Sequence, residues 1–295
     1  KKKTSMGNHL GNSEDKSAKD KNTLLVHITA YLFFEIPEES LHHVQAETRR
    51  LLTNFNSLKG FVLLSVEGVN VFICGEQDQV ETFKQAFHKI IQQELTYKRS
   101  ICTTQPYNRM LVKIKKEIIA FGVESIHPEK SQPCPHVKPR QLLDWLRDEK
   151  EEVVLLDTRN DYEYELGTFQ GAVTLDLQHF RDFPNAIKDL PESLKGRKIV
   201  TFCTGGVRCE KAGPYLIQNG FSNVYQLHGG ILKYFEDCGS EHYDGDCYVF
   251  DKRVALDPNL SETKTIMCFA CRQPLSPELQ TNLPNCPKCG KNVES

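Results

Sequence analysis

The sequence predicts an α/β protein built from three parts. Residues 24–118 give strands and helices in the order βαββαβ, and residues 134–240 alternate strands with helices as a parallel sheet requires. Residues 266–295 contain two Cys-x-x-Cys pairs and four prolines in a stretch too polar to build a large core. These three observations set the fold class, and each part predicts its own chemistry.

The first domain is expected to be ferredoxin-like, because this fold has the βαββαβ order. Its glycine-containing dipeptide Glu67-Gly68 separates two apolar runs and predicts a tight hairpin. The expected elements are strands at 24–28, 60–66, 69–74 and 99–103 and helices at 37–53 and 78–95. Residues 1–23 are polar and aperiodic and are expected to be a disordered lead-in.

The second domain is expected to be a parallel sheet with helices on both faces. Apolar strands at 153–156, 198–202 and 224–227 alternate with helical stretches that include 142–146 and 231–235. In open sheets of this kind, ligands bind at the carboxyl ends of the strands. Residues 119–133 are interpreted as a linker before this domain and 241–265 as a connecting segment after it.

A candidate active-site loop follows the strand at 198–202 and reads Cys203-Thr204-Gly205-Gly206-Val207-Arg208. The two glycines allow a tight turn that aims backbone N–H groups at the Cys203 sulfur, and the helix that follows adds its positive end. Arg208 adds a cation suited to an oxyanion or a persulfide. The sequence therefore predicts Cys203 as a thiolate nucleophile with Arg208 as its catalytic partner.

The residues of this loop disfavour two other interpretations. An inert buried cysteine at a strand end would need neither the glycines nor the arginine. A phosphatase of this design needs five residues between its cysteine and arginine to surround a phosphate, and four stand here. Sulfur chemistry is therefore favoured over phosphate chemistry.

The loop and its flanks resemble the rhodanese family. Asp157-Thr158-Arg159, Glu163-Tyr164 and Gly171-Ala172 look like the family's signature before the loop, and His228-Gly229-Gly230 matches it afterwards. The resemblance implies a cysteine that carries sulfur as a persulfide, with Asp157 and Arg159 supporting the loop. Thr168 departs from the family, in which histidine is common at this position.

The C-terminal module is expected to hold a structural zinc ion on Cys268, Cys271, Cys286 and Cys289. Two Cys-x-x-Cys turns each aim two sulfurs at one centre and together complete a tetrahedron. Two redox dithiols are the alternative, and the proline-rich context disfavours them. No sequence pattern indicates an organic cofactor or an oxygen-activating iron or flavin site.

Composition limits the setting. The net charge is −2 and no run of about twenty apolar residues occurs, so neither a coat on nucleic acid nor a membrane span is expected. Eleven cysteines without a secretory signal favour a reducing compartment, the cytoplasm or the nucleus. One basic span with interleaved tyrosines is a candidate RNA contact or simply a solvated face. Its residues are Lys98, Arg99, Arg109, Lys113, Lys115 and Lys116.

The order of parts over residues 24–290 resembles the rhodanese-containing tRNA uridine hydroxylases. That resemblance implies oxygen-dependent hydroxylation of the wobble uridine of tRNA. Three hypotheses follow: sulfur transfer through a Cys203 persulfide, which is the main interpretation; tRNA modification by the same loop; and a non-catalytic binding module. The expected partners are a small sulfur donor or a persulfide-carrying protein, and tRNA. Cys209 is interpreted either as a resolving thiol for Cys203 or as a packing residue.

Overall fold

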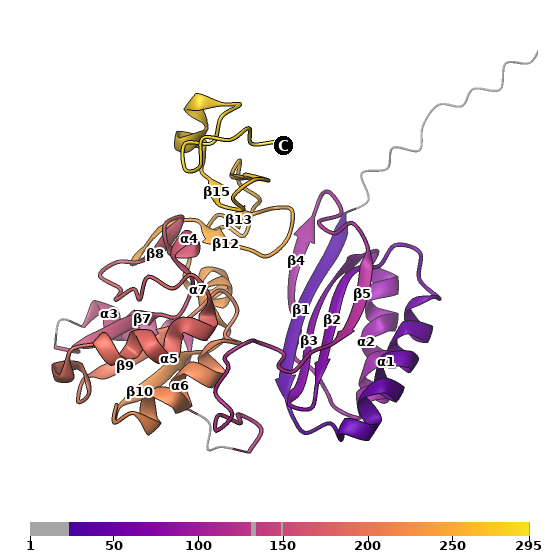
Figure 1. The fold of residues 1–295 in the computed structure, drawn as a ribbon, viewed down its shortest axis with the longest axis horizontal. Coiled ribbons are helices and arrows are strands. Elements are labelled where there is room, and N and C mark those ends of the chain that lie inside the picture. Colours follow the sequence, from indigo (N-terminus) through magenta and orange to yellow (C-terminus); the bar gives the residue numbers. More distant parts are fainter. Residues whose placement is uncertain (1–23, 131–133, 149, 295) are drawn as a thin grey trace, which may run out of the picture.

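The computed structural model describes residues 24–130, 134–148 and 150–294, so the predicted lead-in lies outside the described residues. The first domain is a five-stranded sheet in the order β4-β1-β3-β2-β5, with both helices on one face (Figure 1). Its elements are β1 (Leu25–Phe33), α1 (Glu38–Leu52), β2 (Lys59–Ser65), β3 (Gly68–Gly75), α2 (Gln77–Ile91), β4 (Lys98–Cys102) and β5 (Met110–Ile114). The ferredoxin-like order is confirmed, and β5, which lies parallel to β2, is an addition that the sequence did not predict.

The core of this domain follows from the two periodicities of its sequence. Val26, Ile28 and Ala30 alternate along β1 and are buried on the helical face, where Phe83 and Phe87 of α2 pack. The alternate residues of β1 point to the other face of the sheet. That second face is left free to receive another part of the chain.

The β2–β3 hairpin is one residue earlier than expected. Ser65 pairs with Gly68, so the two-residue loop is Val66-Glu67 rather than Glu67-Gly68. Gly68 has φ +137°, and a Cβ there would stand 2.0 Å from the Leu32 carbonyl oxygen. Glycine is therefore required by the close approach of β1, and not by the turn itself.

The second domain contains a four-stranded sheet in the order β6-β10-β9-β7, with every pair parallel as predicted. Leu142 of α3 and Ile231 of α7 pack on one face, while Phe183 of α5 and Leu216 of α6 pack on the other. The strands and helices are β6 (His136–Val137), α3 (Pro139–Arg147), β7 (Val153–Asp157), α4 (Asp161–Tyr164), α5 (Phe183–Ala186), β9 (Lys198–Phe202), α6 (Cys209–Gln218), β10 (Val224–Leu227) and α7 (Gly230–Cys238).

Short hairpins make up the rest of the chain. β8 (Gly167–Phe169) pairs with β11 (Tyr243–Gly245), β12 (Cys247–Tyr248) pairs with β13 (Ala255–Leu256), and β14 (Ile266–Met267) pairs with β15 (Pro274–Leu275). The cysteine module lies against the second domain, where Lys288 donates to the Glu165 carboxylate. Among the described helices, none combines the length and apolar character needed to cross a bilayer.

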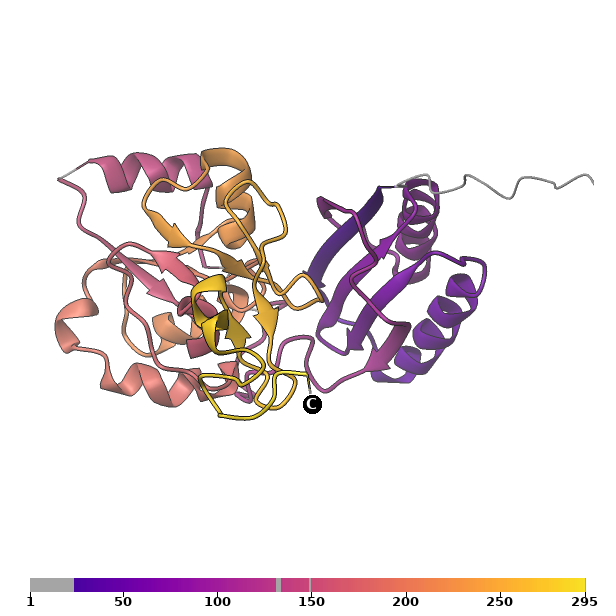
Figure 2. The same cartoon turned by 90° about the horizontal axis from the view of Figure 1, so that it is seen from above.

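The second domain faces the helix-free side of the first sheet (Figures 1 and 2). Lys211 of α6 is buried there and lies 2.8 Å from a carboxylate oxygen of Glu67 and 2.8 Å from one of Glu117. On the other side, Arg253 of the connecting segment pairs with Asp251 at 2.6 Å and donates to Ser100 of β4. The buried Lys211–Glu67 pair and the hydrogen bond from Arg253 to Ser100 therefore join the first domain to the rest of the chain.

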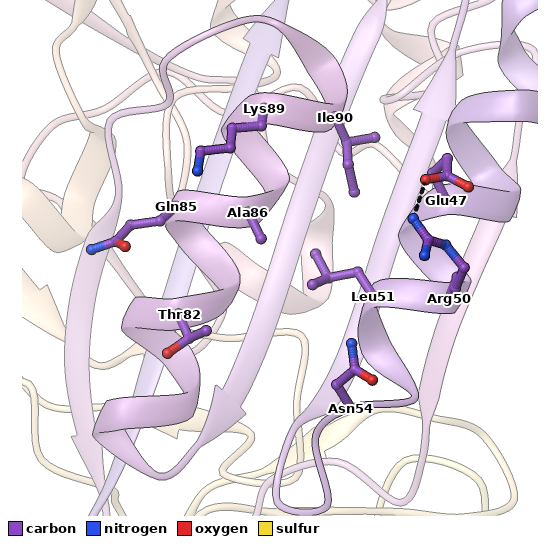
Figure 3. Close-up of a pocket in the computed structure, with 9 residues that line it drawn as sticks. All are labelled: Glu47, Arg50, Leu51, Asn54, Thr82, Gln85, Ala86, Lys89 and Ile90. Atoms are coloured by element: carbon purple, nitrogen blue, oxygen red, sulfur yellow. Dashed lines mark hydrogen bonds and ion pairs between the residues drawn. The ribbon is translucent and has the colours of Figure 1, made fainter.

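A surface pocket of about 340 Å³ lies between α1 and α2, on the side of the sheet away from the second domain (Figure 3). Its lining combines charged, polar and apolar side chains, and it includes an ion pair between Arg50 and Glu47 at 2.7 Å. The residues that line it are Glu47, Arg50, Leu51, Asn54, Thr82, Gln85, Ala86, Lys89 and Ile90. None of them belongs to the cysteine loop, so the candidate active site lies elsewhere.

Candidate active site

The loop from Cys203 to Arg208 connects the carboxyl end of β9 to the first residue of α6, as predicted. The Gly206 N–H donates to the Cys203 Sγ over 3.0 Å. Gly206 has φ +100°, and a Cβ at this position would lie 2.8 Å from the Tyr31 Oη. The second glycine is therefore needed both to aim its N–H at the sulfur and to let the first domain approach.

The surroundings of Cys203 favour the thiolate. Burial alone would raise the pKa of this thiol, but the Cys209 thiol, the Arg208 guanidinium and the N–H groups of Arg208 and Gly206 outweigh it and lower the pKa. Burial and the neighbouring thiolate raise the pKa of Cys209. These opposite shifts in pKa favour an anionic Cys203 beside a neutral Cys209.

Cys209 occupies the first residue of α6, is fully buried, and has the Thr158 Oγ1 at 3.8 Å from its Sγ. Its buried position fits the packing alternative. Its action as a resolving thiol stays a prediction.

Arg208 is not the open cation that the sequence suggested. Its Nη1 and Nη2 donate to the two carboxylate oxygens of Glu163 over 2.7 and 2.8 Å, and both side chains are buried. Thr204 Oγ1 donates to the same carboxylate over 3.3 Å. Arg208 therefore holds the loop through Glu163, and its charge lowers the pKa of the Cys203 thiol. Glu163 comes from α4, and its presence in the Glu-Tyr signature is the only signal that sequence reasoning had for it.

Asp157 and Arg159 form a fully buried ion pair at the carboxyl end of β7. The Arg159 Nη2 donates to Asp157 over 2.6 Å and to the Gly167 carbonyl over 2.8 Å. Thr168, at the position where histidine is common in rhodaneses, donates to Asp157 over 2.8 Å and so joins the same network. Thr158, which lies between Asp157 and Arg159 in the chain, contacts the end of β9 that carries the loop. Its N–H and its Oγ1 both donate to the Phe202 carbonyl oxygen.

The first domain adds two side chains beside the loop. The sequence indicates Lys98 only as a possible RNA contact, and it does not single out Tyr31. Lys98 of β4 donates to the Gly205 carbonyl, and its Nζ lies 5.5 Å from the centre of the Tyr31 ring. Tyr31 of β1 donates to the Glu210 carboxylate of α6 over 3.1 Å. Burial lowers the pKa of Lys98 to about 8, and the Cys203 thiolate opposes that shift. The thiolate site is thus completed by a cation from the other domain.

Replacing Lys98 by methionine is therefore expected to raise the pKa of Cys203 and slow its reaction at neutral pH. A lower thiolate pKa means that reactivity is already present below the usual thiol pKa of about 8.5, so losing a cation must move the profile to higher pH. The measurement is the rate of iodoacetamide labelling of the Cys203 peptide against pH. Lys98→Arg should restore the low-pH reactivity, and an unchanged profile for Lys98→Met would contradict the assignment.

The structure does not bring the predicted basic span together. Lys98 and Arg99 lie on β4, whereas Lys113 lies on β5, and these strands form opposite edges of the sheet. Lys98 is committed to the cysteine loop. The remaining members are exposed, namely Arg99, Arg109, Lys113, Lys115 and Lys116. The five exposed residues fit a solvated face, and their contact with RNA stays a prediction.

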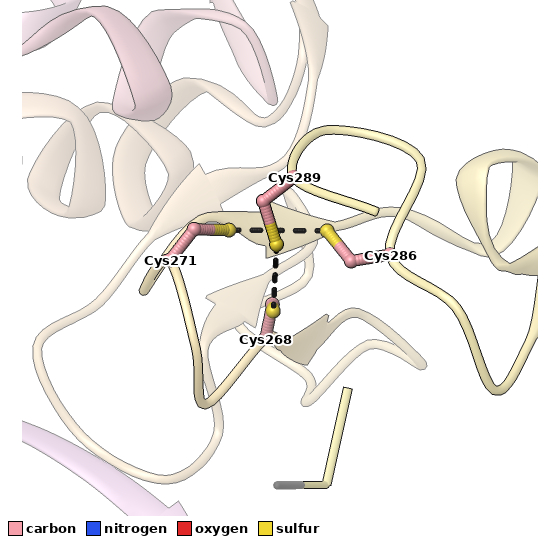
Figure 4. Close-up of side chains that lie close together, drawn as sticks. All are labelled: Cys268, Cys271, Cys286 and Cys289. Carbon is pink, nitrogen blue, oxygen red and sulfur yellow. Dashed lines mark hydrogen bonds between the residues drawn. The ribbon is translucent and has the colours of Figure 1, made fainter. Parts of the chain in front are cut away.

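The four C-terminal cysteines meet as predicted (Figure 4). Their sulfurs all lie within 4.8 Å of one another, with 3.9 Å between Cys268 and Cys289 and 3.8 Å between Cys271 and Cys286. Those separations far exceed an S–S bond of about 2.05 Å. A tetrahedral ion with metal–sulfur bonds of about 2.3 Å would place its sulfurs about 3.8 Å apart, so the group fits a metal ion.

Comparison with known proteins agrees with this architecture. Residues 25–118 match the family model of the UPF0176 acylphosphatase-like domain, and residues 138–237 match that of the rhodanese-like domain. The chain is 41% identical to a tRNA uridine(34) hydroxylase of Cupriavidus metallidurans over 276 residues, which cover 90% of this chain and 96% of that protein. This chain belongs to the tRNA uridine(34) hydroxylase family.

Other relatives show the same pattern. A tRNA uridine(34) hydroxylase of Burkholderia ambifaria is 41% identical over 284 residues, covering 90% of this chain and 98% of that protein. The rhodanese-like domain of an Anabaena protein is a more distant match, at 23% identity and a TM-score of 0.32, covering 38% of this chain and 79% of that one. The family members match this chain over both large domains. A function for the chain must therefore involve both domains and not the second domain alone.

Proposed function

We propose that this chain is a tRNA-modifying enzyme that hydroxylates uridine 34 through Cys203. The observation that carries the proposal is the placement of a stabilised thiolate at the junction of two domains, within a chain that matches tRNA uridine(34) hydroxylases over 90% of its length. A simple sulfur carrier would have no need of a first domain that contributes Lys98 and Tyr31 to its loop. A non-catalytic binding module would have no need to stabilise a thiolate.

The proposed reaction uses the Cys203 thiolate and the uracil ring of the substrate. An unpaired anticodon uridine can be splayed out to meet an enzyme loop. The Cys203 sulfur adds to C6 of uracil, which forms an S–C6 bond and moves the C5=C6 electron pair toward C5 and O4. Carbon 5 then takes one oxygen atom from dioxygen, the C5 proton leaves, and the thiolate is expelled as the double bond re-forms. This replacement of C5–H by C5–OH is a two-electron oxidation, and a thiol reductant supplies the two electrons that convert the second oxygen atom to water.

The test is mass spectrometry of tRNA nucleosides from cells that lack this protein. The expected result is loss of a position-34 uridine heavier by one oxygen atom, and its return when the wild-type chain is expressed. Unchanged nucleosides in the deleted cells would overturn the proposal. The test is made in cells because we propose that the protein acts in the cytoplasm rather than the nucleus, and the cytoplasm supplies both tRNA and a thiol reductant.

Sulfur transfer remains a second candidate because the loop presents hydrogen-bond donors to an anionic sulfur. In that reaction the Cys203 thiolate takes the outer sulfur of thiosulfate, releases sulfite and holds a persulfide until an acceptor removes it. The donor would be such a small molecule or a persulfide-carrying protein. Thiocyanate formation from thiosulfate and cyanide by the purified chain measures this activity directly, separately from the nucleoside assay.

We further propose zinc as the metal of the C-terminal cysteines. Four thiolates in tetrahedral spacing are the ligands of structural zinc, and a closed set of four leaves no position for a substrate. The module's small core contains Leu275 and Val293 besides the cysteines themselves. The ion would therefore supply much of the folding free energy of residues 266–295.

Removing that ion is expected to unfold the module and leave the two larger domains folded. A strong chelator should release about one zinc per chain, measured by a colorimetric dye, and should make residues 266–294 cleavable by protease. The Lys288 contact to Glu165 should be lost with it. Cys268→Ser should show the same cleavage without chelator, whereas Cys238→Ser, on α7, should not. Protease resistance of the metal-free module would contradict the assignment.

A further inference from the structure

Phe250 is an exposed aromatic side chain beside the cysteine loop. It is 45% exposed although its ring lies 5.5 Å from the Arg208 guanidinium carbon, and Arg208 is itself only 5% exposed. Leaving a phenylalanine in water forgoes the favourable burial of its ring, about 1.5–3 kcal/mol when complete. Phe250 is thus an aromatic side chain that is open to solvent and contacts the last residue of the candidate active-site loop.

The backbone that carries Phe250 is held rigidly. It lies between β12 and β13, where the Val249 N–H donates to the Val254 carbonyl. The Tyr248 ring packs edge-on against Phe250 at 5.1 Å, and the Tyr248 carbonyl accepts a hydrogen bond from Thr204 of the loop over 3.3 Å. The Phe250 ring is thus fixed relative to the loop by its own neighbour.

The same turn is anchored to the first domain. Asp251 and Arg253 form a buried pair at 2.6 Å, with the Arg253 Nη2 3.4 Å from His27 of β1. The Lys252 N–H donates to the Pro106 carbonyl over 3.2 Å, while the Lys252 side chain is exposed. Phe250 therefore stands on a turn fixed to both domains, with an exposed cation two residues along the chain.

We propose that Phe250 is a stacking platform for the uracil base that reacts at Cys203. This inference rests on the proposed function and assigns a substrate-contacting residue to that same site. Aromatic side chains held rigidly beside a cation are the common means of binding an unpaired base, because the ring stacks on the base and the cation meets the phosphate. The Arg208 guanidinium near the Phe250 ring fixes it further.

Two features favour a base over a partner protein. A protein surface would need a broad apolar patch, and the other exposed large apolar side chains of the described residues all belong to segments other than this turn. Those side chains are Leu24, Val66, Ile101, Ile217, Phe269, Leu279 and Leu283. A single aromatic ring on this turn, with the exposed Lys252 two residues along the chain, suits one unpaired base better than a protein surface.

The experiment places a fluorescent probe at the platform. The chain has one tryptophan, Trp145, which packs on Tyr225, so Trp145→Phe with Phe250→Trp reports from position 250 alone. An anticodon stem-loop RNA with uridine at position 34 should quench this signal, and the same RNA with an abasic site at 34 should quench it at least twofold less at saturation. Equal quenching by the two RNAs, or none by either while both bind, would overturn the proposal.

A second variant tests how much stacking on Phe250 contributes to RNA affinity. Phe250→Ala should weaken binding of the uridine RNA by about tenfold and of the abasic RNA by little, because only the first can stack. Phe269→Ala is the matched control, since Phe269 is also exposed and has the Arg272 guanidinium carbon 5.7 Å from its ring, but belongs to the cysteine module. Its effect should not depend on the base at position 34. A loss in Phe250→Ala that is equal for both RNAs would overturn the stacking role.

The two proposals fail in different ways. If neither RNA binds the wild-type chain and nucleosides are unchanged in deleted cells, the proposed function fails and the stacking role falls with it. If uridine 34 is modified normally and Phe250→Ala behaves as the wild type in binding and turnover, the stacking role alone is wrong. Labelling of Cys203 by iodoacetamide at an unchanged rate in Phe250→Ala shows that the loop is intact in either case.

Discussion

Replacing Cys203 by serine is expected to abolish modification of uridine 34. A serine hydroxyl is not ionised near neutral pH, so the hydrogen bond from Gly206 and the nearby cations have no anion to stabilise. Loss of a covalent nucleophile commonly lowers turnover by at least about a thousandfold. The measurement is the amount of modified position-34 nucleoside in deleted cells that express Cys203→Ser at wild-type level.

The control for this variant is Cys238→Ser. Cys238 is the last residue of α7, lies at the opposite end of that helix from the loop, and should support full rescue. Full rescue by Cys203→Ser would show that the thiolate is not the nucleophile. It would leave the family relationship intact while removing the proposed mechanism.

The local motifs were predictable because each is complete within a few residues. The cysteine loop spans Cys203 to Arg208, and each metal-binding turn spans four residues, so spacing alone fixes what those backbones can do. The βαββαβ order and the parallel sheet followed from periodicity in the same way. All of these depend on neighbours along the chain.

What sequence reasoning missed depends on tertiary pairing. Lys98 donates to the Gly205 carbonyl although the two residues are 107 positions apart in the sequence, and Arg208 donates to Glu163, which is 45 positions away. No local pattern indicates which distant carboxylate will neutralise a buried guanidinium. The basic span is continuous in sequence but divided in the fold, because β5 pairs with β2 and so carries Lys113 to the edge opposite β4.

The Glu163–Arg208 pair leads to the second large effect. Replacing Glu163 by glutamine should lower the free energy of unfolding by about 3 kcal/mol, because a buried guanidinium loses its compensating charge. The amide also offers one acceptor oxygen where the carboxylate accepts from both Arg208 terminal nitrogens and from Thr204. The shift of the urea midpoint for the second domain, followed by circular dichroism, measures the effect.

A second carboxylate on the same stretch gives the matched comparison. Glu165 is exposed and pairs with Lys288, so Glu165→Gln should change the free energy of unfolding by less than about 0.5 kcal/mol. Combining Glu163→Gln with Arg208→Met removes both buried charges and should recover most of the lost stability, yet it should not recover modification of uridine 34. The double variant should recover stability because no buried charge is left unpaired. It should not recover activity, because the Cys203 thiolate depends on the loop conformation that Arg208 and Glu163 hold in place. If Glu163→Gln unfolds at the wild-type urea midpoint, the pair does not organise the loop in the way described.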